Sequence, residues 1–342
     1  MRGFIKFCVL LCLPIAVMVV FYIIEDPYKV IWHYDNYYPS DNVIVLNRGY
    51  VSAMHYINYQ KEYGYDSFIF GNSRSIAFQE KEWKKYIPES SRCYHFDVSR
   101  GSIRELYGEI NYINESGGAL RNALIVLDIG MLWWTENKGI LYMMPPILKN
   151  QTGTVAFHYE YFKSFYEHDF FCAYIDYKTN KEFKPYMMDY FLNPRWKNGY
   201  NPTNNELYWD KQEESISEGT YYDAERIRCF ENAQFPEKPS YCALNDERKE
   251  LFRRIKVLFD IQKTDYRLII SPLYDQIKIN PDDLQFLYNV FGEEYVFDFS
   301  GINKWNEDFH NYYEASHYRP CVANEIMEIV YSNGIEMIPI DQ

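Results

Sequence analysis

The chain has 342 residues, which corresponds to one large domain or two modest ones at about 150 residues per domain. Its 35 Lys and Arg against 48 Asp and Glu give a net charge of −13, which argues against a nucleic-acid-binding protein because such proteins need a basic surface. Hydrophobic residues at 47% and charged residues at 24% exclude bulk disorder, and 7 Cys are too few for a disulfide scaffold. The unusual feature is an aromatic content of 19%.

An apolar, uncharged run covers residues 7–24, and Arg2 and Lys6 precede it. A membrane-spanning helix needs about 20 apolar residues, and basic residues favour the cytoplasmic side. We therefore predict a transmembrane signal anchor within residues 1–26. The amino terminus would be cytoplasmic and the rest of the chain periplasmic or extracellular, as in a single-pass membrane protein.

Two other N-terminal signals compete with the anchor. A cleaved signal peptide needs small residues at the end of the apolar run, but this run ends Val-Val-Phe-Tyr-Ile-Ile and its only alanine is Ala16. A lipoprotein signal would place a small residue before Cys12, where the chain has Leu11. Both comparisons favour an uncleaved anchor.

Beyond the anchor, strand and helix patterns alternate along the chain. We expect strands over 66–70, 92–98, 123–127, 266–270 and 295–299, and helices over 48–63, 75–86, 101–113, 246–263, 281–290 and 321–333. This alternation predicts a doubly wound, mainly parallel α/β sheet. The expected units are the anchor, a juxtamembrane segment (27–64), a first core half (65–134), an insertion (135–245) and a second core half (246–342).

The insertion is rich in Tyr, Phe and Trp, which leaves two interpretations of its rings. They could stack on sugar faces. Alternatively, they form the insertion's own core or a surface beside the membrane, where Tyr and Trp are favoured, and this second interpretation is the preferred one.

Polar residues follow two of the expected strands, where ligands bind in such sheets. Ser73 comes just after the strand at 66–70, and Gly71 allows a sharp turn there. His317 lies after the last strand, where it can act as a general base toward a serine at the position of Ser73. Glu314, three residues earlier, is placed to orient the imidazole, and Asp298 is the rival acid.

These segments resemble the sequence blocks of the SGNH (GDSL-like) hydrolase superfamily. Phe70-Gly-Asn-Ser73-Arg is similar to its first block, Ser99-Arg-Gly101-Ser to its second, and Glu314-Ala-Ser-His317 to its last, where Asp-x-x-His is usual. The resemblance implies a flavodoxin-like, SGNH-type core and a catalytic Ser73, His317 and Glu314. It prefers Glu314 over Asp298 by spacing, and it implies an oxyanion hole made by the backbone N–H groups of Ser73 and Gly101.

The resemblance is incomplete at the third block, which usually supplies an Asn donor. The corresponding stretch is Leu127-Asp-Ile-Gly-Met131, and an ionised Asp128 cannot donate a hydrogen bond. Loss of one oxyanion donor costs roughly 10²–10³ in rate, so a weakened or altered site is expected.

Other candidate sites are few. Arg74, Arg100 and Arg319 flank the motifs and are candidates to bind an anionic substrate, although local ion pairs are the more common role of such residues. The His residues form no metal-ligand spacing and no phosphate or dinucleotide loop occurs, so we expect no metal and no cofactor. The spacing of Cys229 and Cys242 leaves a disulfide between them open.

The closest resemblance is to membrane-anchored members that act on cell-envelope polymers. It implies an extracytoplasmic serine esterase or O-acyltransferase acting on the acyl groups of a polysaccharide, with a membrane-bound O-acyltransferase as the expected partner. The alternative is a non-catalytic accessory or binding protein of polymer assembly with a degenerate site. The missing Asn and the large insertion are the features that motivate this alternative.

Overall fold

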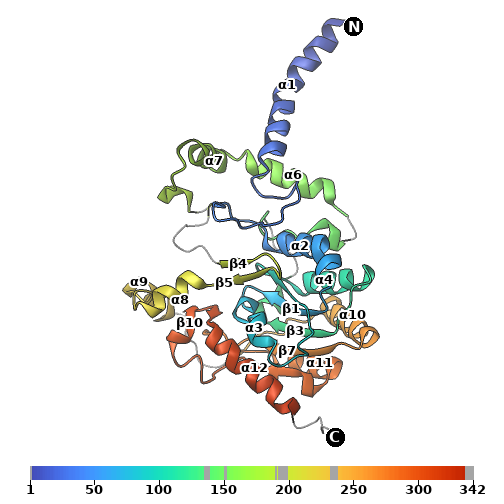
Figure 1. Cartoon of the computed structure of the whole chain (residues 1–342), viewed down its shortest axis with the longest axis vertical. Coiled ribbons are helices and arrows are strands. Elements are labelled where there is room, and N and C mark those ends of the chain that lie inside the picture. Colours follow the sequence, from blue (N-terminus) through green and yellow to red (C-terminus); the bar gives the residue numbers. More distant parts are fainter. Residues whose placement is uncertain are drawn as a thin grey trace.

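A computed structural model describes residues 2–134, 139–149, 152–188, 191, 199–231 and 238–335. Its centre is a five-stranded parallel sheet with the order β2-β1-β3-β7-β9 (Figure 1). The strands are β1 (Ser67–Asn72), β2 (Cys93–Val98), β3 (Asn122–Leu127), β7 (Asp265–Ile270) and β9 (Val296–Asp298). Counted along the chain this order is 2-1-3-4-5, which places the topological switch point between β1 and β3.

β3 and the middle of β1 are apolar because both faces of the sheet are covered. All six residues of β1, β2 and β3 are buried. Phe68 and Phe70 of β1 belong to the hydrophobic cluster on one face, whereas Ile69 belongs to the cluster on the other. This period of two is the pleat of the strand, and it confirms the expected α/β fold with a parallel sheet.

Helices cover both faces (Figure 1). One face carries α2 (Arg48–Tyr63), α4 (Ile103–Glu115), α10 (Asp246–Gln262) and α11 (Pro281–Phe291). The other carries η1 (Ser75–Ala77), α3 (Glu80–Trp83) and α12 (Pro320–Ile335). Side-chain caps start α2 and α10: Asn47 accepts a 3.0 Å hydrogen bond from the Tyr50 N–H, and Asn245 accepts a 3.0 Å bond from the Arg248 N–H.

The helix expected over 75–86 is interrupted in the structure. Phe78 and Gln79 between η1 and α3 have extended backbones, with ψ values of 99° and 138°. The extended segment buries the Phe78 ring completely against α12 and the sheet. Tertiary burial of one large ring therefore overrides the local helical pattern.

The segment between β3 and α10 is built mainly of short elements. They are α5 (Ile129–Trp133), η2 (Pro146–Lys149), α6 (Thr154–Phe165), α7 (His168–Asn180), η3 (Pro185–Met187), β4 (Gly199–Asn201), β5 (Glu206–Tyr208), α8 (Asp210–Ser217), α9 (Ala224–Glu231) and β6 (Lys238–Pro239). In two small two-stranded sheets, β4 pairs with β5, and β6 pairs with β8 (Ile277–Lys278). The segment lies over the core at several places.

The rings of α6 and α7 pack against the residues that follow α1 (Arg2–Glu25). We call this group the aromatic cluster; its buried rings are Tyr22, Tyr28, Tyr37, Tyr50, Phe157, Tyr161, Phe165, Phe170, Tyr174 and Phe191. Tyr161 and Phe165 are fully buried. The described rings of the insertion thus serve mainly as core, and not as an exposed sugar platform.

α1 extends away from the rest of the chain, with α6 and α7 at its base (Figure 1). Contacts at this end are polar as well as apolar: Lys178 of α7 forms a 2.7 Å ion pair with Glu25. In the part of the chain that the structure describes, no helix combines the length and the apolar character that crossing a membrane requires.

Candidate active site

A cavity of about 530 Å³ opens at the carboxyl ends of β1 and β2. Its lining comes from the turn after β1, the turn after β2, the insertion and the loop near the C-terminus, and it comprises Val45, Leu46, Ser73, Arg74, Ser99, Arg100, Trp134, Leu141, Tyr142, Ser316 and His317. This is the edge of the sheet at which open α/β folds bind their ligands. The topology thus brings together residues that lie more than 240 positions apart.

Ser73 occupies the turn between β1 and η1. Gly71, two residues earlier, is crowded: a Cβ atom there would lie 2.8 Å from the Val126 carbonyl oxygen and 2.8 Å from Ser75 Cβ. Only glycine fits at this distance, so Gly71 permits the close approach of β1 to β3 just before the turn that carries Ser73. Among the described residues, the Ser73 backbone N–H has no acceptor.

A short hairpin carries the other two residues. In it, β10 (Tyr312–Glu314) pairs with β11 (His317–Tyr318), and Glu314 stands opposite His317 across a two-residue turn. The spacing of three in Glu-x-x-His is therefore the spacing of two facing hairpin residues. The turn is tied to the core, because the Ala315 carbonyl accepts a 3.2 Å hydrogen bond from the Tyr274 N–H.

The three side chains form one hydrogen-bonded line. Ser73 Oγ lies 2.6 Å from His317 Nε2, and Glu314 Oε1 contacts His317 Nδ1. Burial alone would raise the pKa of Glu314, but the hydrogen bond and charge of His317, helped by Ser316, outweigh it and lower the pKa to about 2. An ionised Glu314 holds the proton on Nδ1, which leaves Nε2 to accept the Ser73 hydroxyl proton.

Asp298, the rival acid, is engaged elsewhere. Its Oδ2 forms a 2.9 Å ion pair with Lys278, and its Oδ1 accepts hydrogen bonds from the Ser300 N–H at 2.9 Å and the Ser300 hydroxyl at 2.6 Å. These contacts stabilise the end of β9. The structure places Glu314, and not Asp298, beside His317.

The expected oxyanion donors are only partly available. The Gly101 N–H donates a 3.0 Å hydrogen bond to the Val98 carbonyl, which closes the turn after β2. Asp128, at the third-block position, is 1% exposed and caps α5 by accepting a 2.8 Å bond from the Met131 N–H. The Asn72 amide donates to Asp128 as well, so it does not supply the missing donor.

The three candidate arginines have different surroundings. Arg74 and Arg100 line the cavity, and the Arg100 guanidinium lies 5.1 Å from the centre of the Tyr142 ring. Arg319 is not in the lining; its Nε and Nη2 bind Glu213 of α8 at 2.9 and 2.7 Å. Arg319 therefore acts as a local ion pair that joins the insertion to the hairpin.

Residues of the insertion support the hairpin, and motif spacing did not predict these contacts. Tyr221 donates a 3.0 Å hydrogen bond to the Tyr313 carbonyl, and Tyr222 donates a 2.8 Å bond to the Tyr312 carbonyl. The Trp209 ring packs against His317 with 5.6 Å between ring centres. These residues could not be found from motif spacing, because they follow no element of the core and carry no reactive group.

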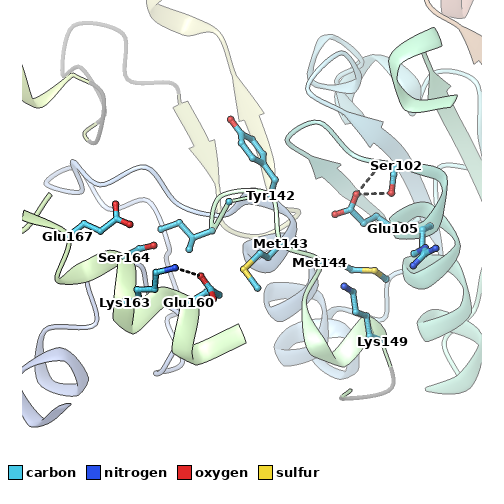
Figure 2. A pocket seen from close by; sticks show the side chains of 13 residues that line it. Ser102, Glu105, Tyr142, Met143, Met144, Lys149, Glu160, Lys163, Ser164 and Glu167 are labelled. Atoms are coloured by element: carbon cyan, nitrogen blue, oxygen red, sulfur yellow. Dashed lines mark hydrogen bonds and ion pairs between the residues drawn. The ribbon is translucent and has the colours of Figure 1, made fainter. Parts of the chain in front are cut away.

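A second cavity of about 480 Å³ lies beside the first (Figure 2). Figure 2 shows Glu105 of α4 and its N-cap Ser102 on one side, and Glu160 and Lys163 of α6 with Glu167, the N-cap of α7, on the other. Tyr142 lines both cavities. The segment 139–149, part of the insertion, thus lines both the second cavity and the one that holds Ser73.

In the described part of the chain, no group of three or more His, Cys, Asp or Glu side chains is arranged to hold a metal ion. Cys229 and Cys242 are both free thiols in the structure. The Cys242 thiol donates to Asp283 Oδ1 at 3.1 Å, and this contact raises its pKa. The disulfide that the sequence left open is therefore not formed.

Comparison of the sequence with known proteins adds no family. No protein-family model matches the chain, and no curated protein matches it either. An α/β domain with a five-stranded parallel sheet is established, and it is compatible with the SGNH fold without being specific to it.

Proposed function

We propose that this protein is an SGNH-like serine esterase or O-acyltransferase with a flavodoxin-like core. One observation carries the proposal: Ser73 Oγ lies 2.6 Å from His317 Nε2, while Glu314 holds the opposite ring nitrogen. A serine, a base and an orienting acid in this order are the parts of an activated nucleophile. Their place at the carboxyl edge of the sheet gives an acyl group access to Ser73.

The chemistry follows from these positions. Ser73 Oγ attacks the acyl carbonyl carbon while His317 Nε2 takes the hydroxyl proton, and the carbonyl electrons move to the oxygen. Collapse of this tetrahedral intermediate expels the alcohol, which receives the proton from His317. Water in an esterase, or a sugar hydroxyl in a transferase, then attacks the acyl-Ser73 ester while His317 Nε2 takes its proton. The bond between the acyl carbon and Ser73 Oγ breaks, and His317 returns the proton to Ser73.

The cell-envelope role is part of the proposal. It rests on the apolar sequence of residues 7–24 and on the resemblance of the three motif blocks to envelope enzymes. Under this proposal the apolar residues 7–24 hold the chain at the membrane, with the catalytic side outside the cytoplasm. An acylated polysaccharide is then the substrate, and a membrane-bound O-acyltransferase is the partner that supplies or uses its acyl groups.

The proposal is tested with the full-length chain in detergent and p-nitrophenyl acetate as the acyl donor. We expect release of p-nitrophenol by the natural chain and none by Ser73→Ala. Ser332→Ala is the matched control, because Ser332 is exposed on α12. Equal activity of Ser73→Ala and the control would reject the proposal.

One observation favours the second candidate, a non-catalytic accessory protein. The Gly101 N–H is engaged with Val98, and Asp128 replaces the usual donor, so two expected oxyanion contacts are missing. Cells distinguish the two functions. If deletion of the gene removes polymer acylation but Ser73→Ala restores it fully, the accessory role is correct; if Ser73→Ala fails to restore it, the enzyme is.

A further inference from the structure

Arg74 is the residue that follows the candidate nucleophile, and its side chain is 11% exposed. It lines the same cavity as Ser73 and His317. Its Nε donates a 3.1 Å hydrogen bond to the Ser316 carbonyl and lies 3.4 Å from Asp128 Oδ2. The side chain is therefore fixed between the end of β3 and the hairpin turn that carries His317.

The remaining donors of Arg74 are the informative ones. Neither Nη1 nor Nη2 has an acceptor among the described residues. Neither atom is among the fully buried polar atoms without a partner, so both are open to solvent and to a bound molecule in the cavity that Arg74 lines. A donor set held rigidly beside a nucleophile is what stabilises a developing oxyanion, because it needs no reorganisation during the reaction.

The surrounding residues leave this task open. Of the two backbone donors expected for the oxyanion, the Ser73 N–H is without an acceptor, whereas the Gly101 N–H is engaged. Asp128, at the position of the usual Asn, cannot donate when ionised. Asp128 is instead placed to hold the Arg74 guanidinium by charge. The position of the usual Asn thus fixes a neighbouring hydrogen-bond donor and does not donate itself.

We propose that Arg74 is a catalytic residue, whose Nη groups donate hydrogen bonds to the oxyanion of the tetrahedral intermediate on Ser73. The proposal rests on the serine esterase or acyltransferase function proposed above. The oxyanion would be held by the Ser73 N–H and by the charged Arg74. The positive charge offsets the absence of the neutral amide donor, since hydrogen bonds from a charged donor are about twice as strong as neutral ones.

The test compares Arg74→Ala with the natural chain by p-nitrophenyl acetate kinetics and by the affinity of an alkyl boronic acid, which forms a tetrahedral anion on serine. We expect kcat to fall by roughly 10²–10³, with a similar loss of boronic acid affinity. Guanidinium ion, added below its denaturing concentration, is expected to restore part of kcat. Arg253→Ala, which removes an exposed guanidinium on α10, is the matched control.

Several outcomes would overturn the inference. An unchanged kcat with a raised KM would show that Arg74 only binds a group of the substrate. An unchanged boronic acid affinity would show that it acts on the position of the hairpin and not on the oxyanion. If the natural chain itself forms no adduct at Ser73, the proposed function fails; if Arg74→Ala reacts as fast as the natural chain, only the role of Arg74 fails.

Discussion

The nucleophile and the acid–base pair of the site have different supports. Ser73 follows β1, a central strand whose six residues are all buried and which pairs with β2 on one side and β3 on the other. Glu314 and His317 lie instead on a hairpin with strands of three and two residues, held by the insertion. The sheet thus positions the nucleophile Ser73, whereas side chains of the insertion position the hairpin that carries Glu314 and His317.

This difference explains why the acid–base half depends on the insertion. A two-stranded hairpin of this size has little stability of its own in water. Tyr221 and Tyr222 satisfy its outward carbonyls, and Arg319 ties it to Glu213. We therefore expect damage to the insertion to reduce catalysis more than global stability, and damage to the core to do the reverse.

The largest expected effect is the loss of kcat when either Ser73 or His317 is removed. Ser73→Ala and His317→Ala should each lower kcat by up to about 10⁶, because members of a triad act as a unit. The double variant should be no worse than either single one. Additive losses in p-nitrophenyl acetate turnover would instead mean that the two residues act separately.

The next effect is a loss of stability caused by removing one buried ion pair of the core. Arg48, at the start of α2, donates from Nε to Asp97 Oδ2 at 2.8 Å, and their side chains are 4% and 2% exposed. Arg48→Ala leaves a buried carboxylate without its partner and should lower the free energy of unfolding by about 3–5 kcal/mol. Urea unfolding measures this loss. Arg253→Ala, on the exposed side of α10, is the control, and an equal loss in both variants would contradict the account.

A smaller effect should separate the two supports. Removing both hydroxyls by Tyr221→Phe and Tyr222→Phe leaves the Tyr313 and Tyr312 carbonyls with fewer donors. We expect unfolding free energy to change by about 1–3 kcal/mol, but kcat to fall by about tenfold to a hundredfold because the hairpin shifts. Tyr241→Phe, at a ring that is 84% exposed, is the control. Loss of stability without loss of kcat would show that the insertion does not position the hairpin.

The smallest effect concerns pH. Since the pKa of Glu314 falls from 4.5 to about 2 on folding, its contribution to stability is fully present above about pH 4.5 and is lost as the pH falls toward 2. The stability difference between the natural chain and Glu314→Gln should therefore shrink across this range. Urea midpoints at several pH values check the trend, and Glu89→Gln removes an exposed carboxylate as the control. A constant difference would show that His317 does not hold Glu314 ionised.

Much of the fold could be predicted because the strands are continuous apolar runs and the helices have clear caps. The strand 123–127 and the helix 48–63 match β3 and α2 closely. The break at Phe78 could not be predicted, since it depends on a ring finding space against α12. Local pattern does not record such distant burial.

The part of the site that depends on short sequence motifs could be predicted. The positions of Ser73, Glu314 and His317 could be proposed because strand ends and the Glu-x-x-His spacing mark them. The fixing of Arg74 by Asp128 could not, because it depends on how the turns after β1 and β3 meet, and the engagement of Gly101 with Val98 depends on the exact geometry of the turn after β2. The support from Tyr221 and Tyr222 depends likewise on the path of the insertion.

The central claim is that Ser73 is a nucleophile activated by His317. The most direct measurement is the reaction of the full-length chain with a fluorophosphonate, followed by mass spectrometry of the labelled peptide. We expect a single adduct on Ser73 that is absent in Ser73→Ala and forms much more slowly in His317→Ala. A chain that forms no adduct, or one whose adduct persists in Ser73→Ala, would contradict it.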